Sequence, residues 1–168
     1  MSNAQWSTVD TPAGPFTAIV ADDGAVLASG WTADPAELTA VVSTALRPTG
    51  LRKVRDLGEV TIAVHRYHAG EFDAIDLIPV RQRSGAFLQH AWDVLRTVPA
   101  GKQVTYRDFA ALAGRPPAIR AAASACARNA AALFVPCHRV LRVGGALGGF
   151  RWGLPVKQWL LDHEAGLH

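Results

Sequence analysis

The chain has 168 residues, 49% of them hydrophobic and 18% charged, with a formal net charge of +3. This length and composition suit one globular domain or two small ones. Charged residues interrupt the longest apolar stretches, and no charged-then-apolar leader is visible, so we expect neither a transmembrane span nor a secretion signal. We therefore expect a cytoplasmic protein with no membrane partner.

The two halves of the chain differ in charge. Residues 1–84 carry 7 Lys and Arg against 10 Asp and Glu, a net charge of −3, whereas residues 85–168 carry 10 against 4, a net charge of +6. A basic half indicates an anionic partner, and nucleic acid is the commonest such partner. Arginines that only solvate a helical surface would give the same count.

The first half alternates strand and helix signals. Turn-forming residues bound two short apolar runs, and Asp34 followed by Pro35 is typical of a helix N-terminus. Residues 2–4 have the composition of a cloning remnant, and we assign them to no element. We predict strands at residues 16–20, 25–29 and 75–80, and helices at residues 35–46 and 57–69. This half contains no nucleophile, metal cluster or phosphate loop, so we interpret it as a scaffold.

The second half is mostly helical by pattern. Apolar residues recur at helical spacing between Phe87 and Val98, and Thr105 is a candidate cap for the next helix. Two short helices across a Gly-containing turn are typical of a helix-turn-helix. We predict helices at residues 87–98, 106–113, 118–128 and 155–164.

The helix at residues 118–128 has an unusually small-residue surface, with five alanines, one serine and one cysteine between Arg120 and Arg128. A reader of base edges in the major groove would carry long polar side chains instead. A smooth face with an arginine at its start is better suited to the minor groove, without sequence reading. The residues that we expect to contact DNA are Arg120, Ala121, Ser124, Arg128 and Arg139.

The segment Pro136-Cys137-His138-Arg139 carries the candidate nucleophile. Pro136 stiffens the backbone before Cys137, and the adjacent His138 and Arg139 are the base and cation that lower a thiol pKa. An inert buried thiol remains the alternative. Cys126 is the only other cysteine and there is no CxxC pair, so we expect no metal site. The glycine-rich residues 144–149 lack a dinucleotide fingerprint and suit a ligand-wall loop.

Taken together, Tyr106, Arg120, Asn129, the pentad at 136–140 and Glu164 resemble, in order and spacing, the O6-alkylguanine-DNA alkyltransferase family. The resemblance covers nearly the whole chain and is most specific from Thr105 to Gly166. It implies an α+β fold: a small antiparallel-sheet (RNase H-like) domain at residues 5–82, then a mostly helical domain at 83–168 with a winged helix-turn-helix.

The same resemblance implies repair of duplex DNA by direct reversal. A damaged guanine is flipped out of the helix, because its O6 group is inaccessible within the stack, and Arg120 fills the vacated space. Cys137 then accepts the alkyl group irreversibly. No second nucleophile or cofactor is expected, so each molecule, a monomer, acts once.

The resemblance also assigns roles to individual residues. His138, oriented by Glu164, accepts the thiol proton through a bridging water, Asn129 braces the nucleophile loop, and Tyr106 donates a proton to guanine N3. The carbonyls of Cys137 and Val140 receive the exocyclic amine, and the Arg151 backbone N–H faces O6. The residues expected to line the substrate pocket are Val140, Phe150, Arg151, Trp152 and Ala132.

Some positions depart from the family pattern. Trp152 stands where many relatives have a small residue, and Phe150 where they have a tyrosine. Ala130 and Ala132 stand where relatives often have prolines. We expect these differences to affect the size of substrate that is accepted rather than the chemistry. Three other functions remain as alternatives. A non-catalytic alkyltransferase-like lesion-binding protein would lack the cysteine, a winged-helix regulator would not need Cys137, His138 and Glu164 together, and a cysteine hydrolase would need a further oxyanion site.

Overall fold

The computed structural model describes residues 2–168, which divide into two compact units. The first unit extends to Arg83 and also contains the later segment Ala130–Phe134. That segment is held there by Ser29, whose backbone N–H donates to the Ala130 carbonyl at 2.9 Å and whose hydroxyl donates to the Ala132 carbonyl at 2.7 Å. The second unit consists of Ser84–Asn129 and Val135–His168.

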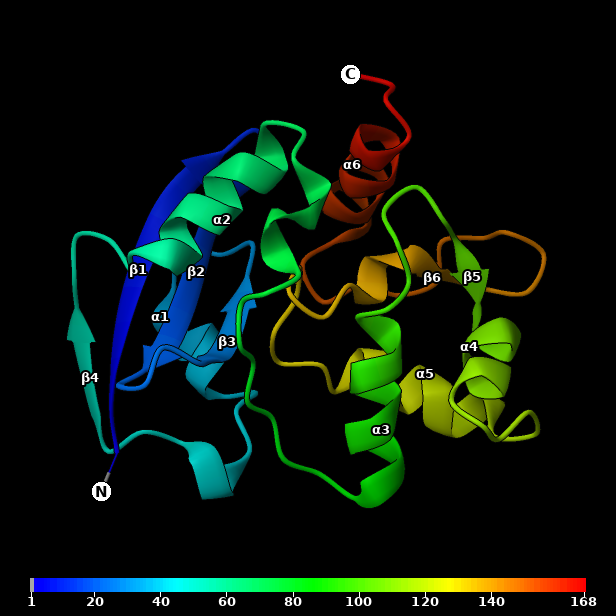
Figure 1. Cartoon of the computed structure of the whole chain (residues 1–168), viewed down its shortest axis with the longest axis horizontal. Coiled ribbons are helices and arrows are strands. Elements are labelled where there is room, and N and C mark those ends of the chain that lie inside the picture. The colour runs from blue at the N-terminus through cyan, green and yellow to red at the C-terminus, as the bar shows by residue number, and fades with distance from the viewer. Residues whose placement is uncertain (1) are drawn as a thin grey trace. The chain divides into compact units, whose positions relative to one another are not determined.

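A four-stranded sheet forms the first unit (Figure 1). Its strands are β1 (Asn3–Thr11), β2 (Gly14–Ala21), β3 (Val26–Gly30) and β4 (Gly50–Lys53), in the order β3-β2-β1-β4. The first three pair antiparallel, but β4 runs parallel to β1. The sheet is therefore mixed, which corrects the antiparallel sheet expected from the resemblance.

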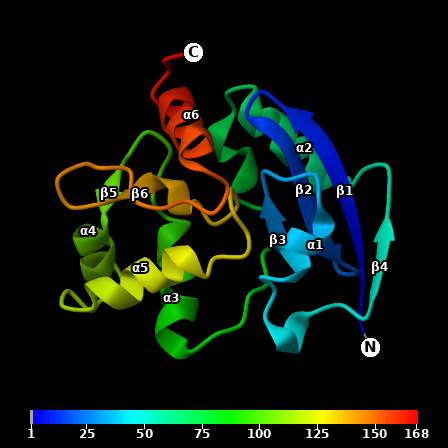
Figure 2. The same cartoon turned by 180° about the vertical axis from the view of Figure 1, so that it is seen from behind.

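Two helices cover opposite faces of this sheet, α1 (Pro35–Thr39) on one and α2 (Glu59–His68) on the other (Figures 1 and 2). The Asp34 carboxylate caps α1 by accepting the Ala36 backbone N–H at 2.9 Å. Two 3-10 helices, η1 (Thr44–Leu46) and η2 (Phe72–Ile75), complete the unit. Its largest fully buried side chains include Phe16, Ile19, Leu38, Ile75 and Tyr67.

Three predictions for this unit were wrong. The helix expected to reach residue 46 ends at Thr39, and η1 follows. Residues 75–80 form no strand, since only Val80 makes an isolated bridge, with Val26. Residues 3–11 and 50–53 form strands that were not predicted, although Asn3 and Ala4 had been set aside as a remnant. The register of β1 depends on partners up to 47 residues away, which local pattern does not encode.

The second unit is mostly helical, and its predicted helices are confirmed to within a few residues at their ends. It contains α3 (Ala86–Leu95), β5 (Val104–Thr105), α4 (Tyr106–Leu112), α5 (Ile119–Ala127), η3 (Cys137–Arg139), β6 (Val140–Leu141) and α6 (Leu154–Glu164). Thr105 and Asp108 form a reciprocal capping box at the start of α4. Helix α3 packs against both α4 and α5, and α6 packs against η3.

The two units together give a mixed α+β fold. Within residues 2–168, none of the helices has the length and apolarity needed to cross a membrane.

Candidate active site

The backbone around Cys137 is fixed on both sides. The Asn129 side-chain amide donates to the Val135 carbonyl at 2.8 Å, and the Cys137 backbone N–H donates to the same oxygen at 2.8 Å. After η3 the chain enters β6, in which Val140 pairs with Val104 of β5. Every residue from 131 to 140 is buried. Cys137 therefore lies on a short turn that hydrogen bonds fix on both sides, and one of these bonds comes from Asn129.

His138, Arg139 and Glu164 form a buried network. The Glu164 Oε2 atom lies 2.7 Å from His138 Nε2, and the carboxylate also accepts Arg139 Nε and Nη2, each at 2.9 Å. The cationic and imidazole partners hold the pKa of the Glu164 carboxyl far below its ordinary value, although burial opposes this shift. An ionised carboxylate can only accept hydrogen bonds, so His138 must donate from Nε2.

The second imidazole nitrogen of His138 is left as an acceptor. Its Nδ1 atom is buried and has no hydrogen-bond partner among the described residues. Burial lowers the pKa of His138, even though Glu164 favours its protonation, so the ring is neutral at rest. A neutral imidazole with one unengaged lone pair is what a general base requires. The structure places the Glu164 carboxylate in hydrogen-bond contact with this ring, and the role of His138 as a base stays a prediction.

The position of Arg139 differs from the sequence-based prediction. It was expected to contact DNA, but its side chain is only 3% exposed and its charged group is bound to Glu164, while Nη1 donates to the Val98 carbonyl at 2.7 Å. A cation held in this way has no surface from which to contact a phosphate. Its guanidinium is instead paired within the second unit with the carboxylate that also contacts His138.

The pKa of Cys137 also differs from the sequence-based expectation. Burial raises the thiol pKa, and this effect exceeds the opposing influences of an Asn129 hydrogen bond and the positive charges of Lys157 and Arg151. Arg139 is not among the groups that lower it. The resting side chain is therefore a thiol, and it needs a base to become a nucleophile.

Lys157 and the side chain of Arg151 were missed by sequence reasoning. Lys157 is 1% exposed, and its Nζ donates to the carbonyls of Val140 at 2.9 Å and Leu147 at 2.5 Å. Arg151 donates from Nη1 to the Asn129 carbonyl at 2.9 Å, and from Nη2 to a carbonyl at the end of α5. Lys157 thus bonds to backbone carbonyls that follow Cys137 in the chain, and Arg151 bonds to carbonyls that precede it. The only signal for Lys157 in the sequence was that no acidic residue lies three or four positions away to pair with it on the helix.

Tyr106 begins α4 directly after β5 and is half-buried. Its hydroxyl makes no hydrogen bond with any residue from 2 to 168. Burial raises the phenol pKa, with smaller contributions from Cys126 and Cys137. The hydroxyl consequently stays protonated at neutral pH and is free to donate to a bound molecule.

Helix α5 and its C-cap residue carry four of the five residues expected to contact DNA. Arg120 and Arg128 are exposed, at the two ends of α5, and neither guanidinium bonds to a described residue. Ala121 and Ser124 are half-buried, whereas Ala122 and Ala125 are fully buried beneath them. The small residues thus serve the packing of α5 as well as its outer face.

The expected pocket residues are distributed between the units. Val140 is buried, while Phe150 and Trp152 are half-buried in the loop that follows β6. The Val140 carbonyl oxygen accepts a hydrogen bond from Lys157 Nζ, and the Cys137 carbonyl oxygen accepts one from the Val140 N–H. Each oxygen therefore keeps one lone pair that an exocyclic amine could use. Ala132 belongs to the first unit, so its place in a substrate pocket remains a prediction.

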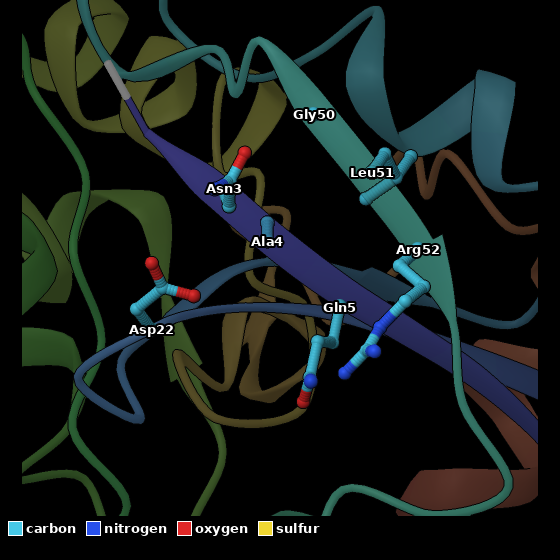
Figure 3. Close-up of a pocket in the computed structure, with 7 residues that line it drawn as sticks. All are labelled: Asn3, Ala4, Gln5, Asp22, Gly50, Leu51 and Arg52. Atoms are coloured by element: carbon cyan, nitrogen blue, oxygen red, sulfur yellow. The ribbon is translucent and has the colours of Figure 1, made fainter.

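A surface pocket of about 390 Å³ occurs elsewhere, in the first unit (Figure 3). Its lining includes Gln5 and Arg52, which are register partners on β1 and β4, and Asp22. None of the predicted site residues lines it. No group of three or more potential metal ligands occurs among residues 2–168.

Comparison with known proteins gives consistent matches. Residues 86–166 match the family described as "6-O-methylguanine DNA methyltransferase, DNA binding domain". The methylated-DNA–protein-cysteine methyltransferase of Shigella flexneri is 30% identical over 161 residues, which cover 95% of this chain and 94% of that protein. The structure of Mycobacterium tuberculosis OGT in complex with DNA has a TM-score of 0.79 and 26% identity, and the match covers 97% of this chain and 94% of that one.

A third relative is much longer. The bifunctional transcriptional activator/DNA repair enzyme Ada of Escherichia coli is 49% identical over 88 residues, and these cover 52% of this chain but only 25% of Ada. The match thus spans about a quarter of that protein.

Proposed function

Because the chain belongs to the methylated-DNA–protein-cysteine methyltransferase family, we propose that it repairs DNA by transferring an O6-alkyl group from guanine to Cys137. The observation that carries this proposal is the buried arrangement of Cys137, His138 and Glu164, with His138 Nδ1 unpartnered. The substrate is duplex DNA bearing O6-alkylguanine, and one protein molecule accepts one alkyl group.

Generation of the thiolate is the first step. The Cys137 thiol passes its proton to His138 Nδ1 through a bridging water, since adjacent side chains on a turn rarely face each other. The resulting imidazolium is stabilised by the Glu164 carboxylate at 2.7 Å. Lys157 and Arg151 stabilise the thiolate by their positive charge. Without the base, burial would keep the sulfur protonated.

Alkyl transfer is an in-line displacement. A sulfur–carbon bond forms as the carbon–oxygen bond to guanine O6 breaks, and the electron pair passes to the guanine ring. Tyr106 donates its phenolic proton to N3, and the Arg151 backbone N–H faces O6. The thioether product has no second nucleophile to displace it, so the protein is consumed.

Recognition of DNA is assigned to α4 and α5, as the helix-turn-helix of a winged domain. Arg120 takes the place of the flipped base, and Arg128, Ala121 and Ser124 lie along the minor groove. By the same family resemblance, residues 5–82 are proposed as an RNase H-like scaffold domain, and residues 83–168 as the domain that binds DNA and accepts the alkyl group. We further propose that the protein acts as a monomer in the cytoplasm, without a cofactor.

The test is transfer of labelled methyl from O6-methylguanine in duplex DNA. Label should reach a plateau at one group per molecule and map to the peptide that contains Cys137, and Cys137→Ser should abolish transfer while leaving DNA binding. Arg120→Ala should slow repair of duplex DNA far more than reaction with the free base, where no unstacking of about a few kcal/mol is needed. Sustained turnover, or label on Cys126, would contradict the proposal.

A lesion-binding protein without catalysis is the alternative. Such a protein would bind the damaged duplex and transfer no label. The presence of Cys137 beside an oriented base favours the enzyme.

A further inference from the structure

Arg142 is placed beside Tyr106 by the backbone. Strands β5 and β6 run parallel, with Val104 opposite Val140 and Thr105 opposite Leu141. In a parallel pair the residues that follow opposite partners emerge at the same edge, so Tyr106 and Arg142 leave the two strands as neighbours.

Packing around Gly148 supports this placement. A Cβ atom at Gly148 would lie 3.0 Å from the Tyr106 hydroxyl oxygen and 3.5 Å from Arg142 Cγ. The phenol and the arginine stem therefore approach the same point of the backbone. Gly148 has φ +72°, a conformation that favours glycine, and a side chain there would press on the Tyr106 hydroxyl.

The charged end of Arg142 is available. Arg139, Arg151 and Lys157 use their charged groups in hydrogen bonds within the second unit. Arg142 is exposed, and its guanidinium bonds to none of residues 2–168.

The loop that carries Arg142 fixes its backbone. The Arg142 N–H donates to the Ala146 carbonyl and the Arg142 carbonyl accepts the Gly145 N–H, both at 2.9 Å. The backbone from which the Arg142 side chain extends is thus anchored. The exposed guanidinium lies close enough to Tyr106 to act against the burial that raises the phenol pKa.

We propose that Arg142 binds a backbone phosphate of the DNA strand that carries the damaged nucleotide, beside Tyr106. This inference depends on the proposed function, because Tyr106 contacts the flipped guanine there. The phosphates flanking that nucleotide then lie near the phenol, and arginine binds phosphate oxygens with a planar pair of donors. Such a contact fixes the position of the strand but reads no sequence.

The first measurement is the salt dependence of DNA binding, in a Cys137→Ser background so that no alkyl transfer occurs. One lost phosphate contact should reduce the slope of log K against log salt by about 0.9 for Arg142→Ala. The wild-type slope should be retained by Arg142→Lys, which keeps the charge. Arg55→Ala is the matched control, because Arg55 is an exposed arginine of the first unit, and its slope should not change.

The second measurement separates a phosphate contact from an effect on Tyr106. Arg142→Ala with Cys137 intact should slow repair of duplex DNA about tenfold, the effect of one charge-assisted hydrogen bond. Its reaction with free O6-methylguanine base should stay at the wild-type rate, since the base has no phosphate.

Three results would overturn the inference: an unchanged salt slope, an unchanged duplex rate, or equal losses on duplex and free base, which would mean that Arg142 acts through the phenol. A wild-type protein that binds DNA but transfers no methyl group would refute the proposed function instead. The salt-slope comparison would still test whether Arg142 contacts a phosphate, because it does not depend on alkyl transfer.

Discussion

Replacement of Arg139 by methionine tests whether this residue supports the active site from within. Arg139→Met removes two hydrogen bonds to the Glu164 carboxylate and one to the Val98 carbonyl, and leaves a buried anion without its cation. Removing one partner of a buried ion pair costs about 3–5 kcal/mol. For a protein of this size, each kcal/mol lowers Tm by roughly 2–4 °C, so we expect a decrease of about 6–20 °C.

The assay is urea unfolding followed by circular dichroism, together with the salt dependence of DNA binding. Arg139→Met should lower the free energy of unfolding while the salt slope of the folded protein stays unchanged. Arg139→Lys retains the charge but not the paired donors, and it should recover part of the lost stability. The comparison variant is Arg128→Ala at the exposed end of α5, which should change stability by no more than about 0.5 kcal/mol and reduce the slope by about 0.9.

The opposite pattern would refute this reasoning. If Arg139→Met keeps its stability within about 1 kcal/mol and loses salt slope instead, then Arg139 contacts DNA and its place in the buried network is wrong.

Three further predictions concern the pocket, the thiol and pH. Trp152→Gly should increase reaction with O6-benzylguanine about tenfold, or roughly 1.4 kcal/mol of barrier, because we expect the half-buried indole to narrow the substrate pocket; no gain over a rapidly reacting wild type would place the indole outside the pocket. Lys157→Met should raise the pKa of Cys137, seen as a higher midpoint in the pH dependence of iodoacetamide alkylation. The free energy of unfolding should fall as the pH is lowered from about 7 to about 4. Folding depresses the pKa values of His138 and Glu164, so the unfolded chain binds protons at a higher pH than the folded chain does. Urea unfolding that is independent of pH would contradict this.

The sequence by itself determined the features that depend on neighbouring residues. The Asp34 cap and the Thr105 cap follow from side chains that bond to backbone groups within three residues, and both are present. The helices of the second unit follow from apolar spacing within each helix. The family assignment rested on the residue types and their spacing around Cys137. These are properties of the covalent chain and do not depend on how the chain folds.

Tertiary structure decided what depends on distant partners. Strands β1 and β4 pair across more than 40 residues, and their sequences carry only weak strand signals, so neither was predicted. The sequence places Arg139 beside Cys137, but folding pairs it with Glu164, 25 residues further on. The pKa of Cys137 likewise depends on burial, which outweighs the charges that adjacent residues suggest. Local pattern predicts helices and caps because their hydrogen bonds close within one turn, whereas burial and ion pairing are properties of the assembled core.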